Sequence, residues 1–210
     1  LARIKKLITR KTKAIVVNSP SNPTGKVLDK SELRELYNLC QERDIHILSD
    51  EAYEDLTFEK PHFAAGALEH SPELVVSLFS LSKSYSMTGW RSGYVVASKR
   101  LIEGMNKFVE NALTCFPPFI QQASAYALDH GDRFIAGFKR EYAARKRLME
   151  EKISEIKRLE PPVIEGSFYA FPLSQWKGGS RDLCMRILRA ENVALIPGSA
   201  FGPFGEGHVR

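Results

Sequence analysis

The stretch of residues 74–97, LVVSLFSLSKSYSMTGWRSGYVVA, indicates how the central part of the chain folds. Its two ends, residues 74–80 and 92–97, are apolar runs with β-branched side chains, which are typical of strands buried on both faces of a sheet. Only about a dozen residues separate the two runs, and the helical crossover that joins parallel strands usually needs more. We therefore expect the second strand to run antiparallel, starting at the sheet edge where the first one ends.

Two further apolar runs precede this stretch, Ala14–Asn18 and residues 45–50. Between them the pattern predicts a helix over Lys30–Arg43, with Asp29 placed to cap it and Glu32 completing a capping-box-like start. Strand, helix and strand in this order form a βαβ unit, whose two strands are parallel. The sequence therefore predicts an α/β fold with a mostly parallel sheet sandwiched by helices.

Helical patterns dominate the chain after the fourth apolar run. Three helices are expected, over residues 99–114, 118–129 and 133–159. Paired prolines at residues 117–118 and 161–162 mark the start of the second helix and the end of the third.

The pattern changes again after residue 160. A short strand over residues 167–171, a helix near Ser180–Glu191 and a strand over residues 193–196 are expected there. We interpret this part as a second, smaller α/β domain, hinged by the long helix. The expected division is residues 1–132 for part of a large domain, 133–160 for a long linking helix, and 161–210 for part of a C-terminal small domain.

The composition is that of a globular protein, since 43% hydrophobic and 26% charged residues allow a core of useful size. The net charge of +5 comes from basic residues interspersed with acidic ones, which argues against a nucleic-acid partner. No apolar run approaches the ~20 residues of a membrane span and no signal peptide is visible, so we expect a cytoplasmic protein without a membrane partner. Cys40, Cys115 and Cys184 share no metal-ligand spacing, so no metal site is expected.

Polar side chains gather where the expected strands end, and ligands of parallel α/β sheets bind outside those carboxyl ends. A loop rich in turn formers, residues 18–25, follows the first strand, and residues 50–53 end the second. Residues 80–83 end the third strand, and residues 89–91 precede the fourth. One sheet edge therefore collects an amide, a carboxylate, a phenol, two hydroxyls, an amine and a guanidinium, namely Asn22, Asp50, Tyr53, Ser80, Ser82, Lys83 and Arg91.

Each of these residues has an ordinary structural explanation when it is taken alone. An asparagine before proline is more often a turn residue, an aspartate after a strand often caps the next segment, and a lone lysine or arginine is usually a surface charge. The tyrosine suits amphipathic packing, and the serines suit the backbone groups of a turn. The combination favours one ligand that needs all of these groups at once.

These motifs resemble those of class I/II aminotransferases, which are pyridoxal-phosphate enzymes with the aspartate aminotransferase fold. The most specific motif is Ser-Leu-Ser-Lys at residues 80–83, followed eight residues later by Arg91. The loop Asn-Pro-Thr-Gly at residues 22–25 also fits, and residues 166–169 and 197–202 resemble the family's small domain. The resemblance thus covers essentially the whole chain.

The resemblance implies a role for each site residue. Lys83 is the expected Schiff-base partner of pyridoxal 5'-phosphate and the base that moves the substrate's Cα proton. Asp50 is expected to pair with the pyridine nitrogen, and Asn22 and Tyr53 with the phenolic oxygen. Lys83, Asp50 and Tyr53 are accordingly the predicted catalytic residues.

The same resemblance implies how phosphate and substrate are held. Ser80, Ser82 and Arg91 match the family's phosphate ligands, because hydroxyls and a guanidinium fork suit a dianion. Arg210 resembles the arginine that grips the substrate α-carboxylate, together with Asn22. An α-amino acid and a 2-oxo acid are the implied substrates, and a homodimer is the implied assembly.

The resemblance also implies that the chain is a fragment. The family's N-terminal part, with its phosphate loop and the aromatic ring stacked on the cofactor, has no counterpart here, nor have the last elements after the carboxylate-binding arginine. Because parallel sheets need both faces covered, we expect these residues alone to be poorly soluble or inactive.

Three alternatives to an aminotransferase remain open at this point. The named residues serve the cofactor rather than one reaction, so a β-lyase or a synthase of the same fold fits them as well. An aminotransferase-like ligand-sensing domain of a transcription regulator is a second alternative, and an inactive gene product is the third. The sequence does not name the amino acid.

Overall fold

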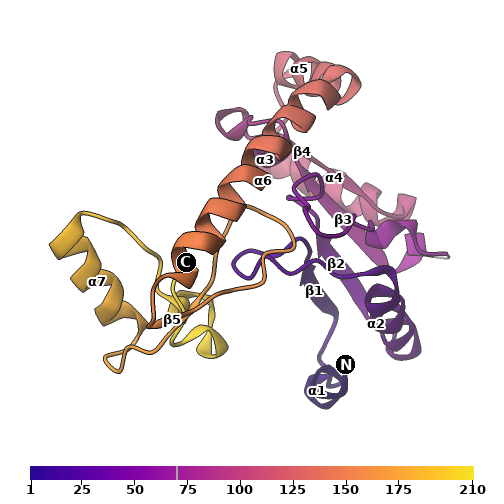
Figure 1. Ribbon diagram of the computed structural model, residues 1–210. Helices are drawn as coiled ribbons and strands as arrows, with labels where there is room; N and C mark the ends of the chain where they lie inside the picture. The colour runs from indigo at the N-terminus through magenta and orange to yellow at the C-terminus, as the bar shows by residue number, and fades with distance from the viewer. Residues whose placement is uncertain (70) are drawn as a thin grey trace.

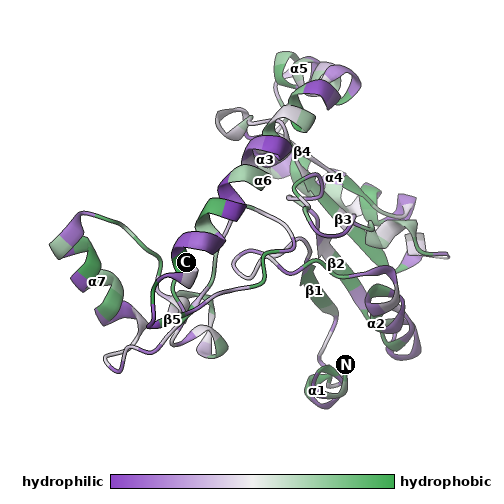
Figure 2. Ribbon diagram, in the orientation of Figure 1, coloured by the Kyte–Doolittle hydropathy of each residue, from purple (hydrophilic) through white to green (hydrophobic). Residues whose placement is uncertain are grey.

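A four-stranded sheet forms the centre of the larger part of the molecule (Figure 1). The computed structural model describes residues 1–69 and 71–210. The strand order is β1-β2-β3-β4, and the strands are β1 (Ala14–Asn18), β2 (His46–Asp50), β3 (Val75–Ser80) and β4 (Gly93–Val96). These strands are among the hydrophobic segments of the fold (Figure 2).

The strand directions confirm both expectations about the sheet. Strands β1, β2 and β3 are parallel, and Asn18, Asp50 and Leu78 lie in register across them. Strand β4 runs antiparallel to β3 and pairs Gly93 with Ser80. A Cβ atom at Gly93 would lie 2.5 Å from the carbonyl oxygen of Phe79, so only glycine allows this close approach of the strands.

Helix α2 (Lys30–Arg43) begins and ends at the predicted residues. The Asp29 carboxylate accepts hydrogen bonds from the N–H groups of Ser31 and Glu32, and Glu32 accepts from the N–H of Asp29, which completes the predicted capping box. The apolar face of the helix is buried against one face of the sheet. This core includes Val17, Leu33, Leu36, Tyr37, Cys40, Ile45, Ile47 and Val75.

The opposite face of the sheet carries the polar strand ends. Successive side chains of a strand point to opposite faces, so Asn18, Asp50 and Ser80 share the face that lies away from α2. Val16 on this same face has a relative exposure of 70%. The sheet therefore separates a hydrophobic core from the predicted site.

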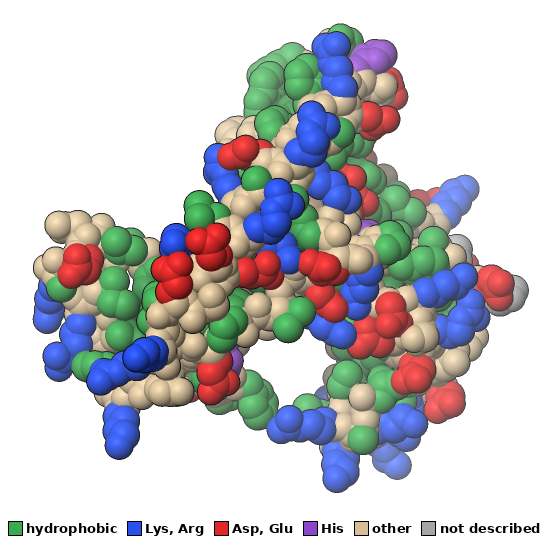
Figure 3. Space-filling model, viewed as in Figure 1, with side chains coloured by type: hydrophobic (Ala, Val, Ile, Leu, Met, Phe, Trp, Pro, Cys, Tyr) green, Lys and Arg blue, Asp and Glu red, His purple; other side chains and the backbone are tan. Residues whose placement is uncertain are grey.

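The other helices lie around the sheet or, toward the C-terminus, extend away from it (Figure 1). They are α1 (Ala2–Leu7), α3 (Leu81–Ser84), α4 (Lys99–Leu113), α5 (Pro118–His130), α6 (Asp132–Ser154) and α7 (Ser180–Glu191). Acidic and basic side chains are intermixed along α6, and Arg145–Glu141 and Lys146–Glu150 form ion pairs there (Figure 3). In the part of the chain that the structure describes, no helix has the length and apolarity to cross a membrane.

The structure corrects three expectations in the second half of the chain. Helix α6 ends at Ser154 rather than at residue 159, because Leu159–Glu160 form β5, which pairs with β6 (Leu173–Ser174). Residues 167–171 form no strand, since Ser167 has a left-handed backbone with φ of 61°. Residues 193–196 form no strand either. There Ile196 exchanges both backbone hydrogen bonds with Arg210, and the contact continues only as an isolated bridge between Pro197 and Val209.

One segment, residues 164–170, joins the sheet to the C-terminal part of the chain. The N–H of Gly166 donates to the carbonyl of Gly25, and the N–H of Ser167 donates to the carbonyl of Leu56 at 2.7 Å. A Cβ atom at Gly166 would lie 2.8 Å from the side chain of Val27, so glycine is required for this close contact. The backbone thereby places residues 168 and 169 beside the loops that follow β1 and β2.

Candidate active site

The ends of β1 and β2 hold the loop that contains Asn22. The side-chain amide of Asn18 donates to the carbonyl oxygen of Asp50 at 3.1 Å, and its Oδ1 accepts from the N–H of Asn22 at 2.6 Å. Oδ1 of Asp50 accepts from the N–H of Ala52 at 3.2 Å. Asn18 was not among the predicted site residues, and it fixes Asn22 relative to Asp50.

Tyr53 is buried beside Asp50 and makes a hydrogen bond between its hydroxyl and that of Tyr169, with the oxygens 2.9 Å apart. Burial raises the pKa of Tyr53 well above its ordinary value. The negative charge of Asp50 raises this pKa further, and the positive charge of Arg210 opposes this effect. The phenol is therefore neutral at physiological pH and has one proton to donate.

Arg210 lies against the loop that follows β1, although 188 positions separate it from Asn22. Its Nη1 donates to Oδ1 of Asn22 at 2.8 Å. Its guanidinium carbon lies 4.3 Å from the ring centroid of Tyr169 and 5.2 Å from that of Phe201. The structure thus brings together the two residues that were predicted to bind the substrate carboxylate.

Lys83 lies in α3, directly after the end of β3. Its Nζ is 5.7 Å from the ring centroid of Phe168. Among residues 1–69 and 71–210, no carboxylate forms an ion pair with this amine. The ring of Phe168 in turn lies 5.4 Å from that of Tyr53, centroid to centroid, so Lys83 and Tyr53 flank the same phenylalanine.

The three predicted phosphate ligands lie at the end of β3 and on the connection from β3 to β4. Oγ of Ser80 accepts from the N–H of Ser82, and the N–H of residue 81 donates to the carbonyl of Ser92, which brings the two ends of this connection together. Arg91 has a left-handed backbone with φ of 53°, an uncommon conformation for a residue other than glycine. Its Nη1 donates to the carbonyl of Thr88 at 2.9 Å.

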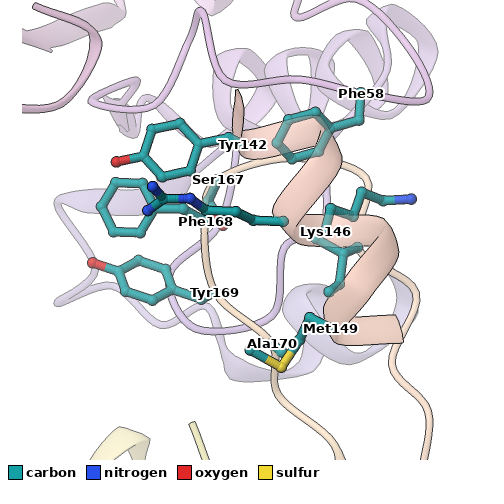
Figure 4. Close-up of a pocket in the computed structure, with 10 residues that line it drawn as sticks. Phe58, Tyr142, Lys146, Met149, Ser167, Phe168, Tyr169 and Ala170 are labelled. Atoms are coloured by element: carbon teal, nitrogen blue, oxygen red, sulfur yellow. The ribbon is translucent and has the colours of Figure 1, made fainter. Parts of the chain in front are cut away.

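Aromatic residues near the site were missed as site residues from the sequence. The ring of Phe168 stacks on that of Tyr142 at 5.3 Å and contacts that of Tyr169 at 4.7 Å. Figure 4 shows these three rings side by side, with both tyrosine hydroxyls on the same side. The rings line a cavity of about 300 Å³ that is also lined by Phe58 and Met149 (Figure 4). The motif at residues 166–169 was the sequence signal for two of these rings, but no functional role was predicted for it.

A second missed feature is a buried pair directly after Asp50. Glu51 has a relative exposure of 0%, and its Oε2 lies 2.6 Å from Nε2 of His62. Its Oε1 accepts from the N–H of Ala65 at 3.3 Å. The pair closes the loop of residues 52–65, and it thereby holds the backbone that presents Asp50 and Tyr53.

The acidic groups after Asp50 predict a pH-dependent stability. Burial, together with the charges of Asp55 and Glu51, raises the pKa of Glu54 from 4.5 to about 8. Between these pH values the folded chain keeps a proton that the unfolded chain has lost, so the free energy of unfolding decreases as the pH rises. We expect Glu54→Gln to flatten this decrease when urea denaturation is measured between about pH 5 and about pH 8. The exposed Glu110→Gln is the control, and equal slopes for both variants would contradict the prediction.

Comparisons with known proteins agree with this geometry. The model of the family described as "Aminotransferase class I and II" matches residues 1–210. The chain is 38% identical to an aspartate aminotransferase of Pyrococcus abyssi, over 99% of this chain and 54% of that protein. It is 38% identical to the putative aminotransferase YugH of Bacillus subtilis, over 97% of this chain and 53% of that protein.

Solved structures show the same fold. An aromatic aminotransferase from Pyrococcus horikoshii superimposes with a TM-score of 0.95 at 37% identity, over 100% of this chain and 57% of that one. The chain therefore spans about half the length of the relatives that it matches. The family match over all 210 residues, the sequence identities and the shared fold lead to one conclusion: the chain belongs to the aminotransferase class I and II family.

Proposed function

We propose that the protein is a pyridoxal-phosphate-dependent aminotransferase that moves an amino group between an α-amino acid and a 2-oxo acid. One observation carries this proposal within the family. Lys83, Tyr53 and Arg210 lie around the same two aromatic residues, Phe168 and Tyr169, although they come from distant parts of the sequence. An amine, a phenol and a carboxylate-binding guanidinium are the groups that such a reaction needs.

The residues present fit pyridoxal phosphate. Lys83 offers an amine that no described carboxylate neutralises, and Asp50 offers a carboxylate at the end of the neighbouring strand. When bound, the cofactor supplies an electron sink for the electron pair left at the substrate Cα. The side chains named here would hold it and supply the charges around it.

Lys83 and Asp50 have complementary tasks. Nζ of Lys83 would hold the cofactor and, when free, would take the proton from the substrate Cα. The half-buried carboxylate of Asp50 would favour a proton on the ring nitrogen, because opposite charges that are shielded from water stabilise one another. Tyr53 and Asn22 would donate hydrogen bonds to the phenolic oxygen.

The remaining residues bind anions. Ser80 and Ser82 would hold the phosphate together with Arg91, whose guanidinium keeps further N–H donors beside its hydrogen bond to the carbonyl of Thr88. Arg210 grips the substrate carboxylate and is oriented by its hydrogen bond to Asn22.

We also propose the wider setting of the protein. Residues 1–132 form part of the large domain that binds the cofactor, residues 133–160 link the domains, and residues 161–210 form part of the small domain. The complete protein is a cytoplasmic homodimer, and the free state of Cys40, Cys115 and Cys184 supports a reducing compartment.

The proposal is tested by incubating the holoenzyme with amino acids and a 2-oxo acid acceptor. We expect a new amino acid to form in a one-to-one ratio with the 2-oxo acid produced from the donor. Release of ammonia with pyruvate would instead identify a β-lyase, and binding of pyridoxal phosphate without turnover would favour a ligand-sensing protein.

A further inference from the structure

Tyr169 makes two separate contacts, one through its hydroxyl and one through its ring. The hydroxyl oxygen lies 2.9 Å from that of Tyr53, and the ring centroid lies 4.3 Å from the guanidinium carbon of Arg210. We propose that Tyr169 is a positioning residue that orients the proton of Tyr53 and the guanidinium of Arg210 at the same time. This inference rests on the proposed function.

The ring of Tyr169 supports the guanidinium without using its hydrogen-bond donors. A cation over an aromatic face is held by the ring's quadrupole. Within the described residues, the side-chain hydrogen bond of Arg210 goes to Asn22 through Nη1. Nε and Nη2 therefore keep their donors, so the ring holds the arginine in place while its fork remains available for a carboxylate.

The hydroxyl of Tyr169 decides where the proton of Tyr53 points. A phenol has one proton to donate and lone pairs that accept, and either of these two hydroxyls is able to donate to the other. When Tyr169 is the donor, Tyr53 accepts and its own proton is free for the phenolic oxygen of the cofactor. In the proposed arrangement Tyr169 is this donor, which leaves Tyr53 to donate to the cofactor.

The main chain holds Tyr169 independently of both partners. The N–H groups of Gly166 and Ser167 are bonded to the carbonyls of Gly25 and Leu56, and Phe168 packs on the ring of Tyr142. Because this anchoring comes from the backbone, changing the side chain of residue 169 leaves the segment in place. The two contacts can therefore be removed one at a time.

The test uses Tyr169→Phe and Tyr169→Leu in the holoenzyme. The phenylalanine variant keeps the ring and loses the hydrogen bond, so the pH midpoint of the bound cofactor's visible absorbance should rise by about half to one unit, because an anionic phenolic oxygen loses part of its stabilisation. Its KM for the amino acid should change by less than about twofold. The leucine variant should show the same shift and also raise the KM about threefold to tenfold.

The control is Tyr126→Phe, which changes a tyrosine with a relative exposure of 68% and should move neither quantity. An unchanged absorbance midpoint in Tyr169→Phe would overturn the role of the hydroxyl, and an equal KM in both Tyr169 variants would overturn the role of the ring. Both results presuppose a wild-type protein that binds pyridoxal phosphate and transaminates. Failure of the wild type in these assays would instead remove the proposed function, and this inference with it.

Discussion

Replacing Lys83 by alanine is expected to abolish covalent attachment of pyridoxal phosphate and to lower the rate of amino transfer by about 10⁴-fold or more. This substitution removes both the amine that holds the cofactor and the base that takes the Cα proton. A general base alone contributes about 10²–10⁴-fold, and loss of the covalent hold adds to this effect. Lys83 has no neighbouring lysine in its four-residue helix, so no other amine in α3 replaces it.

Attachment is measured without reference to activity. The holoenzyme is reduced with sodium borohydride, digested, and its peptides are analysed by mass spectrometry. We expect the cofactor's mass on the peptide that contains Lys83 in the wild type and on no peptide of the alanine variant. The control is Lys107→Ala, an exposed lysine on α4. A labelled peptide in the Lys83→Ala protein would show that another lysine carries the cofactor.

Replacing Asp50 by asparagine is expected to lower kcat/KM by about 10²–10⁴-fold. The amide has nearly the same shape as the carboxylate but no charge, so it cannot stabilise a proton on the ring nitrogen. Removing one partner of a buried ion pair costs about 3–5 kcal/mol, which corresponds to this range. The exposed position of Asp129 on α5 offers Asp129→Asn as the matched control.

The Asp50→Asn variant has a second readout in cofactor affinity. The dissociation constant of pyridoxal phosphate, measured by absorbance titration, should increase together with the loss of kcat/KM, because the same charge pair stabilises the bound cofactor. Retention of kcat/KM within about tenfold of the wild type would exclude the ring-nitrogen role of Asp50. Such a result would not affect the assignment of the fold, because β2 is held by backbone pairing with β1 and β3 and not by the side chain of Asp50.

The sheet and helix α2 were predictable because their signals are local. The short connection between residues 80 and 93 is enough to impose the antiparallel direction of β4, since a crossover does not fit in that length. The capping box of α2 needs only Asp29 and Glu32, which are three residues apart. The start of this helix could therefore be predicted from a short stretch of sequence.

The second half was less predictable, because its segments are shaped by distant partners. Residues 167–171 were predicted to form a strand, yet the N–H groups of Gly166 and Ser167 are bonded to the carbonyls of Gly25 and Leu56, and Ser167 has a left-handed rather than an extended backbone. The end of α6 was misplaced for a similar reason, since the pairing of β5 with β6 involves a segment more than ten residues downstream.

The sequence by itself determined the α/β class, the strand directions and the gathering of Asn22, Asp50 and Lys83 at one sheet edge, because short connections and caps act within a few residues. Only the tertiary structure decided that Arg210 meets Asn22, that Tyr169 joins Tyr53 to Arg210, and that His62 is buried against Glu51. These contacts span from 11 to 188 positions, and no spacing rule covers them. The contact between Tyr169 and Tyr53 forms because the backbone of residues 164–170 fits between two loops, which depends on segments far apart in the sequence rather than on any local pattern.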